Sequence, residues 1–305
     1  MKITVVGSSN TDMIIKVPRL PVPGETILGG DFTIALGGKG ANQAVAAARV
    51  GGNVTFIGRV GNDVFGEQAL KGLKEDGINI DYTVKDPLVS SGIAQIVVDE
   101  DGKYIIAVAP GANQNLSDED IMNARKAILA SDILILQLEV PIHTIRFAAK
   151  MAYENNIRVI LNPAPAHPLD DELLNYISVL TPNKLEAESL TGISITDERS
   201  VELAGRILLE RGLTRVIITL GAKGAMVIDN GGAEHVPTFR IKSIDTTAAS
   251  DVFNGALAVA LVEGKNFYES VRFANAAAAL SATRLGAQPS IPGRKEVLEM
   301  LQKHP

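Results

Sequence analysis

A run of small and polar residues, Asp245 to Gly255, leads into the almost entirely apolar stretch Ala256 to Val262. Small residues at the start of a helix let a ligand reach backbone N–H groups that lack partners, and the positive end of the helix dipole there favours phosphate. Asp251 would stay ionised at this place and could accept the proton of an attacking hydroxyl. For an isolated aspartate, the plainer alternative is that it only stabilises the start of the helix.

A second polar cluster, Gly37 to Ala44, precedes another alanine-rich helical pattern. Its glycines let the backbone come close to a ligand, and Lys39 and Asn42 could direct polar groups at hydroxyls. The cluster is not a Walker A loop, because Thr33 stands where that motif has its first glycine and Gly40 where it has serine or threonine. A tight turn with a solvated lysine is the alternative.

Asn10 and Asp12 follow the first β-like run, Ile3 to Gly7. Open α/β sheets bind ligands beyond the carboxyl ends of their strands, so these two side chains are candidates for a binding site. Both residue types also form turns, which is the structural alternative here.

Composition narrows the class of protein. The chain has 305 residues, with 29 lysines and arginines against 35 acidic residues and a net charge of −6, which argues against a nucleic-acid partner. Cysteine is absent, so disulfides, thiolate metal sites and thiol nucleophiles are excluded. The N-terminus does not resemble a secretory signal, and no apolar run approaches the roughly 20 residues that cross a bilayer. We therefore expect a soluble cytoplasmic protein without a membrane partner.

The elements that must position these side chains follow from the hydrophobic pattern. β-like runs at 3–7, 54–58 and 133–137 are followed by helical patterns at 41–50, 65–76 and 142–155, and the alternation continues to about residue 220. It predicts an α/β fold with parallel strands joined by helical crossovers. Ser117 with Asp120 indicates a capping box, and Gly51 and Gly212 indicate helix ends. No linker separates two folding units, so we expect one domain over residues 1–305.

Two regions interrupt the alternation. Residues 13–34 combine β-like residues with three prolines, and the run 93–98 meets the run 104–108 across the turn Asp99 to Gly102. Hairpin-like insertions cannot easily join a parallel sheet. We therefore predict a small separate β-sheet, formed by about residues 13–34 and 93–108, that acts as a lid.

The segments Gly37 to Ala44 and Asp245 to Gly255, in this order, resemble the paired signatures of the PfkB carbohydrate kinases, and the ribokinase branch in particular. The resemblance extends from Val5 to about Pro292, and Asn162 to Ala166 and Gly286 to Ser290 also resemble this branch. It implies a three-layer α/β/α sandwich with a mostly parallel central sheet and a small β-sheet lid. It also implies transfer of the γ-phosphoryl group of ATP to the 5-hydroxyl of D-ribose, giving ribose 5-phosphate and ADP.

The same resemblance implies roles for individual residues. Asp251 would be the base that takes the proton from the sugar hydroxyl, and the backbone amides of Ala248, Ala249 and Ser250 would form the anion hole. The hydroxyls of ribose would be held by a set that mixes donors with carboxylate acceptors, namely Asn10, Asp12, Gly38, Lys39, Asn42, Glu139 and Asp251. Glu139 could otherwise be only an acid at the start of a helix, ahead of Pro141.

On the nucleotide side, Asn183 and Glu186 match the N-x-x-E pattern of the family, whose glutamate helps to organise Mg²⁺ and water at the phosphates. The same pair has capping-box spacing, and both roles can coexist. The loop that contains Thr219, Gly221 and Gly224 would bind ATP, with Asn275 beside the adenine. A plain turn after a strand is the alternative for this loop.

The ribokinase branch also uses a monovalent cation, usually K⁺, and dimers are common in it. By match, the cation ligands would be mainly backbone carbonyls from Asp245, Thr247, Ser281, Arg284, Gly286 and Ser290. A lid with exposed strand edges is also typical of pairing with a second subunit, so we expect a homodimer through the lid.

Ser250 departs from the family, which has glycine immediately before the catalytic aspartate, and Val252 replaces a common threonine. A Cβ at position 250 could crowd the transferring phosphoryl group, or strain the backbone if this position needs a positive φ. The serine could equally donate its hydroxyl to the same anion, or mark an engineered or decayed site. The alternatives are therefore another PfkB sugar or nucleoside kinase, acting for example on fructose or deoxyribose, and a catalytically weakened sugar-binding protein.

Overall fold

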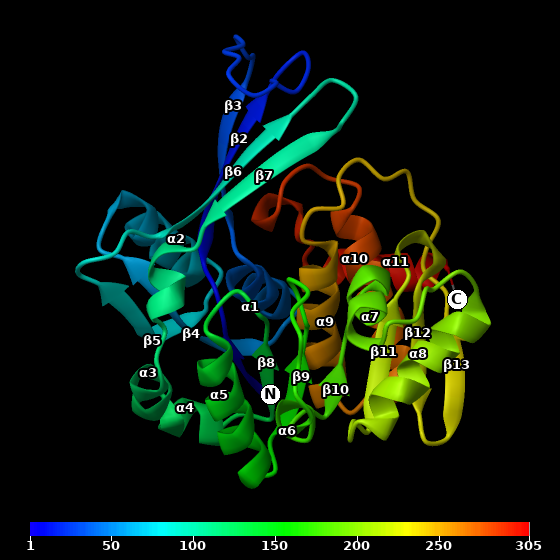
Figure 1. The fold of residues 1–305 in the computed structure, drawn as a ribbon. Coiled ribbons are helices and arrows are strands. Elements are labelled where there is room, and N and C mark those ends of the chain that lie inside the picture. Colours follow the sequence, from blue (N-terminus) through cyan, green and yellow to red (C-terminus); the bar gives the residue numbers. More distant parts are fainter. Residues whose placement is uncertain (305) are drawn as a thin grey trace.

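A computed structural model describes residues 1–304 and contains two β-sheets (Figure 1). In this part of the chain the larger sheet has nine strands in the order β13-β12-β11-β10-β9-β8-β1-β4-β5. All pairs from β5 to β11 are parallel, and β12 and β13 are antiparallel. The strands are β1 (Lys2–Val6), β4 (Asn53–Gly61), β5 (Asn79–Asp86), β8 (Ile133–Leu136), β9 (Arg158–Leu161), β10 (Val179–Leu180), β11 (Arg215–Thr219), β12 (Ala225–Asp229) and β13 (Gly232–Val236).

Helices cover both faces of this sheet, which makes the three layers that the resemblance implies. Alternate residues of a strand point to opposite faces. Ile133 and Ile135 of β8 accordingly pack in one buried cluster with α1, α9 and α10, and Leu134 and Leu136 pack in the other with α5 and α8. The helices are α1 (Lys39–Arg49), α2 (Val64–Glu75), α3 (Asp118–Asn123), α4 (Arg125–Leu129), α5 (Ile142–Glu154), α6 (Asp171–Leu174), α7 (Lys184–Thr191), α8 (Glu198–Glu210), α9 (Ala249–Val262), α10 (Phe267–Ser281) and α11 (Arg294–Lys303), with the 3₁₀ turns η1 (Gly111–Asn115), η2 (Gly221–Lys223) and η3 (Gln288–Ser290).

The helix ends follow the local sequence signals. Ser117 and Asp120 form the predicted capping box at the start of α3. Gly51 and Gly212 adopt φ values of 106° and 105° just after α1 and α8. Only glycine adopts such a conformation without steric cost, so these two residues end the helices as predicted.

The smaller sheet has the strand order β3-β2-β6-β7 and projects beyond the end of the larger sheet (Figure 1). Its strands are β2 (Asn10–Lys16), β3 (Phe32–Gly37), β6 (Gly92–Val98) and β7 (Tyr104–Ala109). The hairpin of β6 and β7 is the predicted one, and β2 pairs with β6 in parallel. This sheet also reaches into the predicted ligand clusters, because β2 begins at Asn10 and β3 ends at Gly37.

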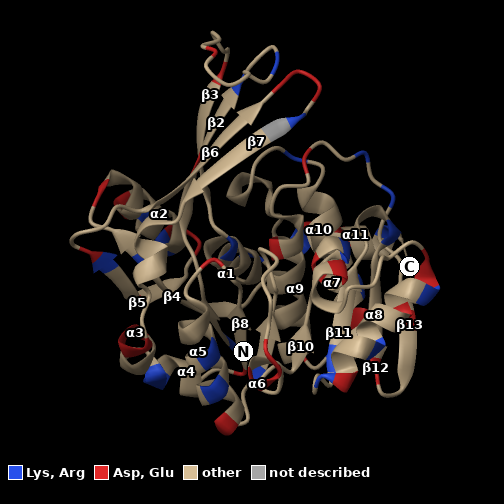
Figure 2. Cartoon of the chain, viewed as in Figure 1, with Lys and Arg blue, Asp and Glu red and all other residues tan. Residues whose placement is uncertain are grey.

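Charged residues lie mainly on the outer helices and turns, whereas α9 carries a single charged side chain, that of Asp251 (Figure 2). Among residues 1–304, no helix combines the length and the apolar character that crossing a membrane requires.

Candidate active site

Two helix N-termini meet at the carboxyl ends of the central strands. α1 and α9 approach closely because Gly255 has no side chain: a Cβ there would lie 2.6 Å from the backbone oxygen of Gln43. Gly38 precedes α1 with a φ of 87°, and it too must lack a side chain, because a Cβ there would lie 2.6 Å from the backbone nitrogen of Asn10. This packing brings Lys39 and Asn42 of α1 to the same place as Asp251 of α9.

Asp251 is almost completely buried, with 3% of its surface exposed. Its Oδ2 accepts a hydrogen bond of 3.0 Å from Asn42 Nδ2, and its Oδ1 accepts one of 2.9 Å from Gln43 Nε2. Within the described residues, α9 has no side-chain cap, so Asp251 does not cap the helix by a hydrogen bond, although as the acidic residue of the first turn it still favours the helix dipole. Burial raises the pKa of Asp251, and the charge of Lys39 and the two amide donors act against this rise.

Lys39 is surrounded by four carboxylates. Burial alone would lower its pKa, but the charges of Asp251, Glu139, Glu186 and Asp12 together raise it, so its ammonium stays protonated. Burial, followed by the charges of Glu139 and Asp251, raises the pKa of Asp12 to about 6. One cation among several acceptors is an arrangement suited to a ligand with many hydroxyl donors.

Glu139 is joined to the start of α1. Its Oε2 accepts hydrogen bonds from Ser8 Oγ at 2.5 Å and from the backbone N–H of Lys39 at 3.0 Å. Glu139 precedes α5 in sequence, yet its carboxylate binds the first turn of a different helix. The side chain therefore belongs to the same polar cluster as Lys39.

Asn10 is held by a residue that the sequence did not indicate. Asn113, in η1, donates from Nδ2 to Asn10 Oδ1 at 2.8 Å, and its Oδ1 accepts from the backbone N–H of Ser9 at 2.9 Å. Gly92 leaves the room for this pair, since a Cβ there would lie 2.2 Å from Asn10 Oδ1. Asn113 follows the strands of the smaller sheet, so only the fold brings it to Asn10.

Two buried acceptors of the site have no hydrogen-bond partner within the described residues: Asn42 Oδ1 and Gln137 Oε1. A buried carbonyl oxygen without a donor costs about 1–3 kcal/mol. Asn42 belongs to the predicted sugar-binding set, and a ligand hydroxyl would satisfy its free oxygen.

The first turn of α9 presents backbone groups rather than side chains. Ala249 N donates to Thr246 O and Val252 N donates to Ala248 O, while the N–H groups of Ser250 and Asp251 have no acceptor in the described part of the chain. Ser250 has an ordinary helical backbone, so the possible strain from a positive φ at this position does not occur. The positive φ of 61° falls instead at Ala248, which turns the chain into the helix.

Asn183 and Glu186 form the capping box of α7, as their spacing predicted. Thr219 lies beside them, because its backbone N–H donates to Pro182 O at 2.9 Å and it forms a parallel bridge with Asn183. The N-x-x-E segment and the predicted nucleotide loop therefore share one edge of the sheet. Burial raises the pKa of Glu186, which is partly offset by its hydrogen bond with Asn183 and by Lys39.

The rest of the predicted nucleotide set gathers around the end of β13. Gly221 and Gly224 adopt φ values of 58° and 92°, and a Cβ on Gly224 would lie 2.2 Å from Val236 O. Asn275 of α10 donates from Nδ2 to the same Val236 O at 3.1 Å. Gly224 and Asn275 are far apart in sequence, yet both lie against the backbone of Val236.

The predicted cation ligands come from two segments that the structure joins. Asp245 Oδ2 accepts from the backbone N–H of Gly286 at 2.9 Å, and its Oδ1 accepts from Thr247 N at 2.9 Å. Burial alone would raise the pKa of Asp245, but the hydrogen bond from the Thr247 hydroxyl to Oδ1, together with these two backbone hydrogen bonds, outweighs it and lowers the pKa. The remaining predicted ligands, Ser281, Arg284 and Ser290, lie in the segment that Gly286 belongs to.

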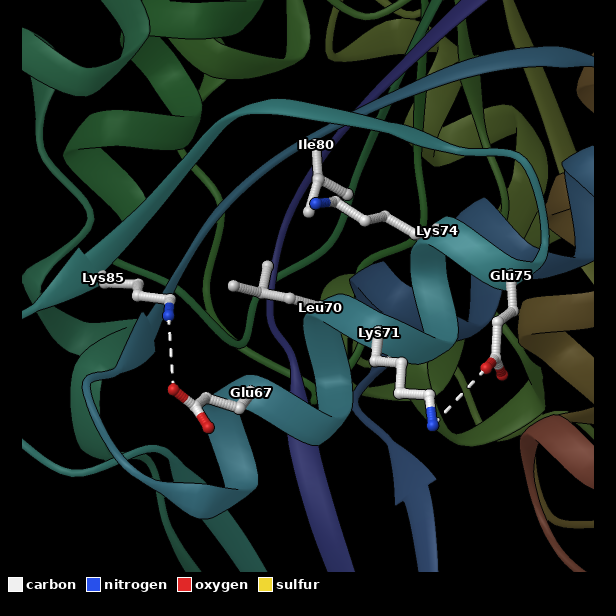
Figure 3. A pocket seen from close by; sticks show the side chains of 7 residues that line it. All are labelled: Glu67, Leu70, Lys71, Lys74, Glu75, Ile80 and Lys85. Atoms are coloured by element: carbon white, nitrogen blue, oxygen red, sulfur yellow. Dashed lines mark ion pairs between the residues drawn. The ribbon is translucent and has the colours of Figure 1, made fainter.

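A separate surface groove lies between α2 and β5 (Figure 3). Lys71 is paired with Glu75 and Lys85 with Glu67, at N–O distances of 3.8 and 3.6 Å. The groove contains none of the residues that the sequence singled out.

Comparison with known protein families matches residues 1–294 to the description "pfkB family carbohydrate kinase". The chain is 45% identical over 300 residues to a ribokinase from Haemophilus influenzae, covering 98% of each chain. It is 37% identical to a deoxyribokinase from Salmonella typhi, covering 99% of each. A structure of Arabidopsis thaliana ribokinase complexed with ribose and ATP superimposes with a TM-score of 0.91 at 34% identity, covering 98% of each chain. The chain belongs to the pfkB family of carbohydrate kinases.

Proposed function

We propose that this kinase transfers the γ-phosphoryl group of ATP to the 5-hydroxyl of D-ribose and releases ribose 5-phosphate and ADP. The similarity to ribokinases over nearly the whole chain supports this reaction. The observation that carries it is the position of the buried Asp251 carboxylate, which accepts hydrogen bonds from Asn42 and Gln43 of α1. Asp251 lies in the first turn of α9, where the backbone N–H groups of residues 250 and 251 have no acceptor within the described residues. A base and an anion site thus share one helix end.

Asp251 is the base in this proposal. It accepts the proton of the 5-hydroxyl while the sugar oxygen forms a bond to the γ-phosphorus and the bond from that phosphorus to the β-γ bridging oxygen breaks, leaving ADP. The free N–H groups at the start of α9 stabilise the charge on the transferring group. Of the proposed anion hole of Ala248, Ala249 and Ser250, the N–H of Ala249 would first have to release Thr246 O. The raised pKa of Asp251 makes its carboxylate a better proton acceptor than an exposed one.

The sugar is held by the polar cluster at the start of α1. Asp12, Glu139 and the free oxygen of Asn42 accept hydroxyl hydrogens, and Lys39 donates to hydroxyl oxygens. Asn10 and the backbone of Gly38 complete the pocket, which the smaller sheet borders directly through Asn10 and Asp12. Closure of this sheet as a lid would exclude water and limit hydrolysis of ATP.

The nucleotide and its ions occupy the adjoining edge of the sheet in this proposal. ATP lies along Asn183, Thr219, Gly221 and Gly224, with Asn275 near the adenine. Glu186 fits Mg²⁺ because a nearby dication would stabilise the charge of its buried carboxylate. No group of three or more metal-ligating side chains occurs within residues 1–304, so the protein itself would supply few of the ligands. Magnesium neutralises phosphate charge when bound, and such sites use mainly phosphate oxygens and water.

A monovalent cation, K⁺ by family resemblance, fits between the segments of Asp245 and Gly286. These segments are already tied together by the carboxylate of Asp245. Among the hydrogen bonds of the described residues, the only proposed ligand whose backbone carbonyl is engaged is Ser281, which accepts from the N–H of Arg284. The proposed ligands are Asp245, Thr247, Ser281, Arg284, Gly286 and Ser290.

The test is an assay of ADP release across a panel of sugars, with and without K⁺. We expect the highest kcat/KM with D-ribose and a higher rate with K⁺ than with Na⁺. A higher kcat/KM with 2-deoxyribose would favour the second candidate, a deoxyribokinase, for which the relative from Salmonella typhi is the supporting observation. Ribose binding in calorimetry without ADP release would contradict the proposed reaction.

We also propose a homodimer that forms through the smaller sheet. By the strand register Phe32, Ile34 and Ile105 share one face of the sheet, and all three are about half exposed, which is unusual for large apolar side chains on one face. The expected result is a dimer in sedimentation experiments that Ile105→Asp together with Ile34→Asp, on the same face of the sheet, converts to a monomer. A parent protein that sediments as a monomer would contradict this assembly.

A further inference from the structure

A chain of buried side-chain amides lies beneath the proposed base. Gln43 Nε2 donates to Asp251 Oδ1 at 2.9 Å and to Asn162 Oδ1 at 3.1 Å, and Gln43 Oε1 accepts from Gln137 Nε2 at 2.7 Å. Asn162 Nδ2 in turn donates to the backbone oxygen of Thr181 at 3.1 Å. Gln43, Gln137 and Asn162 are at most 1% exposed, so water does not compete for these groups.

The backbone of Thr181 sets the direction of the whole chain of amides. A backbone carbonyl can only accept, so Asn162 must turn its NH₂ group to Thr181 and its oxygen to Gln43. Gln43 must then turn its own NH₂ group to Asn162, and the second hydrogen of this group points to Asp251. Gln137 completes the arrangement by donating to Gln43 Oε1. Both hydrogens of the Gln43 amide are therefore engaged, and its oxygen accepts one hydrogen bond.

A fixed amide donor holds the carboxylate without neutralising it. A cation at position 43 would pair with Asp251 and weaken it as a base, whereas an amide that could rotate would at times present its oxygen to the carboxylate. The occupied amide of Gln43 avoids both. The Gln43 amide donates to Oδ1 of Asp251. Oδ2 of Asp251 therefore lies on the side of Asn42, which belongs to the predicted sugar-binding residues and donates to this oxygen.

We propose that Gln43 is a positioning residue for the base Asp251, and that Asn162 acts through it by fixing the direction of its amide. The inference rests on the proposed phosphoryl transfer and adds residues to which neither composition nor motif assigned a role. Gln43 touches neither sugar nor nucleotide in this scheme.

The test variant is Gln43→Leu, which keeps the approximate volume and removes both donors. We expect kcat to fall about tenfold or more, with the KM values for ribose and ATP within about threefold of the parent. Without this donor the pKa of Asp251 rises, so the acid limb of kcat moves to higher pH. Lys39, Asp12, Glu139 and Glu186 also face Asp251, and they are unchanged in this variant.

A second variant, Asn162→Leu, leaves Gln43 in place but frees its amide. We expect a smaller fall in kcat and a smaller shift of the acid limb in the same direction. In the Gln43→Leu background the same substitution should change neither quantity further, because Asn162 has nothing left to act through. This pair also keeps the inference testable if one variant folds poorly.

The matched control is Thr144→Val in α5. Thr144 is fully buried and donates to Leu116 O at 2.9 Å, so this variant loses a buried hydrogen bond away from the site. We expect a lower melting temperature and the parent pH profile.

The outcomes separate this inference from the proposed function. No ADP release by the parent with any sugar would refute the function. An active parent together with a Gln43→Leu variant that keeps the parent kcat and acid limb would refute the inference alone. The same holds if Thr144→Val shifts the acid limb as much as Gln43→Leu does.

Discussion

The sugar end of the site is built from side chains, whereas the phosphate end is built from backbone groups. The sugar end consists of buried side chains: Asn42 and Gln43 hold Asp251 by hydrogen bonds, and Asp12 is buried within reach of the charge of Asp251. The phosphate end consists of backbone groups, namely the free N–H groups of the first turn of α9 and the turn at Ala248. Side-chain replacements should therefore act strongly at the sugar end, whereas the phosphate end should respond mainly to changes in backbone conformation.

The largest expected effect is that of Asp251→Ala. It removes the proposed base, and general-base catalysis contributes about 10²–10⁴-fold, so we expect kcat to fall by a factor in this range. Ribose binding measured by calorimetry should remain largely intact, because the rest of the cluster still contacts the sugar. Turnover near the parent level would show that another group accepts the proton.

Asp12→Asn should weaken sugar binding and stabilise the protein. Loss of a hydrogen bond to a charged acceptor costs about 1.5–3 kcal/mol, so we expect the KM for ribose to rise about tenfold or more. The folded-state pKa of about 6 lies above the ordinary value, so ionised Asp12 destabilises the fold above that pH. At pH 8 the variant should gain about 1–3 kcal/mol in the free energy of unfolding, and this gain should vanish near pH 4.

The parent enzyme offers an internal control for the same group. As pH falls through about 6, Asp12 becomes protonated and loses its negative charge and part of its acceptor capacity, so the KM for ribose should rise. In Asp12→Asn this dependence should be absent. A KM that changes with pH equally in both proteins would assign the effect to another group.

Ser250→Gly is expected to act weakly. The backbone at this position is already helical, so the only gain is space for the transferring phosphoryl group. We expect kcat to rise about two- to fivefold, which corresponds to less than about 1 kcal/mol in the barrier. An unchanged or lower rate in steady-state assays would show that the serine is accommodated, or that its hydroxyl contributes to the anion site.

Ala248→Gly should have the smallest effect, and it should change only the free energy of unfolding and not the kinetic constants. Alanine with a φ of 61° is strained, and glycine removes this strain, although it also adds freedom to the unfolded chain. We expect a gain of about 1 kcal/mol or less in denaturant unfolding, with the KM for ATP within about twofold of the parent. A large change in the KM for ATP would mean that the Cβ of Ala248 contacts the nucleotide.

Much of the fold could be predicted from the chain because the governing signals are local. Hydrophobic alternation indicated the parallel strands β1, β4, β8, β9, β10 and β11 but missed the parallel edge strand β5, and capping residues indicated the ends of α1, α3 and α8. The antiparallel strands β12 and β13 were not predicted. β13 (Gly232 to Val236) is mostly exposed and lacks the pattern of a buried strand. β12 is buried, but a second strand follows it, so it falls outside the alternation of strands and helices. The start of β2 at Asn10 was also missed, since its residues resemble turn formers.

The site divides in the same way. Glycines and acidic residues in contiguous motifs indicated Lys39, Asn42 and Asp251, and the structure brings these together. Contacts such as Gln43 with Asn162 join residues 119 positions apart and leave no local signal. The backbone φ angles of Ala248 and Ser250 could not be predicted from the sequence either, because they depend on how the loop enters the helix.

Asn10 has a consequence for energetic coupling. It is both the first residue of a strand of the smaller sheet and a proposed sugar contact, and Asn113, which follows the last strand of that sheet, holds its side chain. If the sugar binds one orientation of the sheet more tightly, then thermodynamic reciprocity requires that whatever holds the sheet in this orientation raises the affinity for sugar by the same factor. A second subunit bound to the sheet would then act as an effector of the sugar site without touching the sugar.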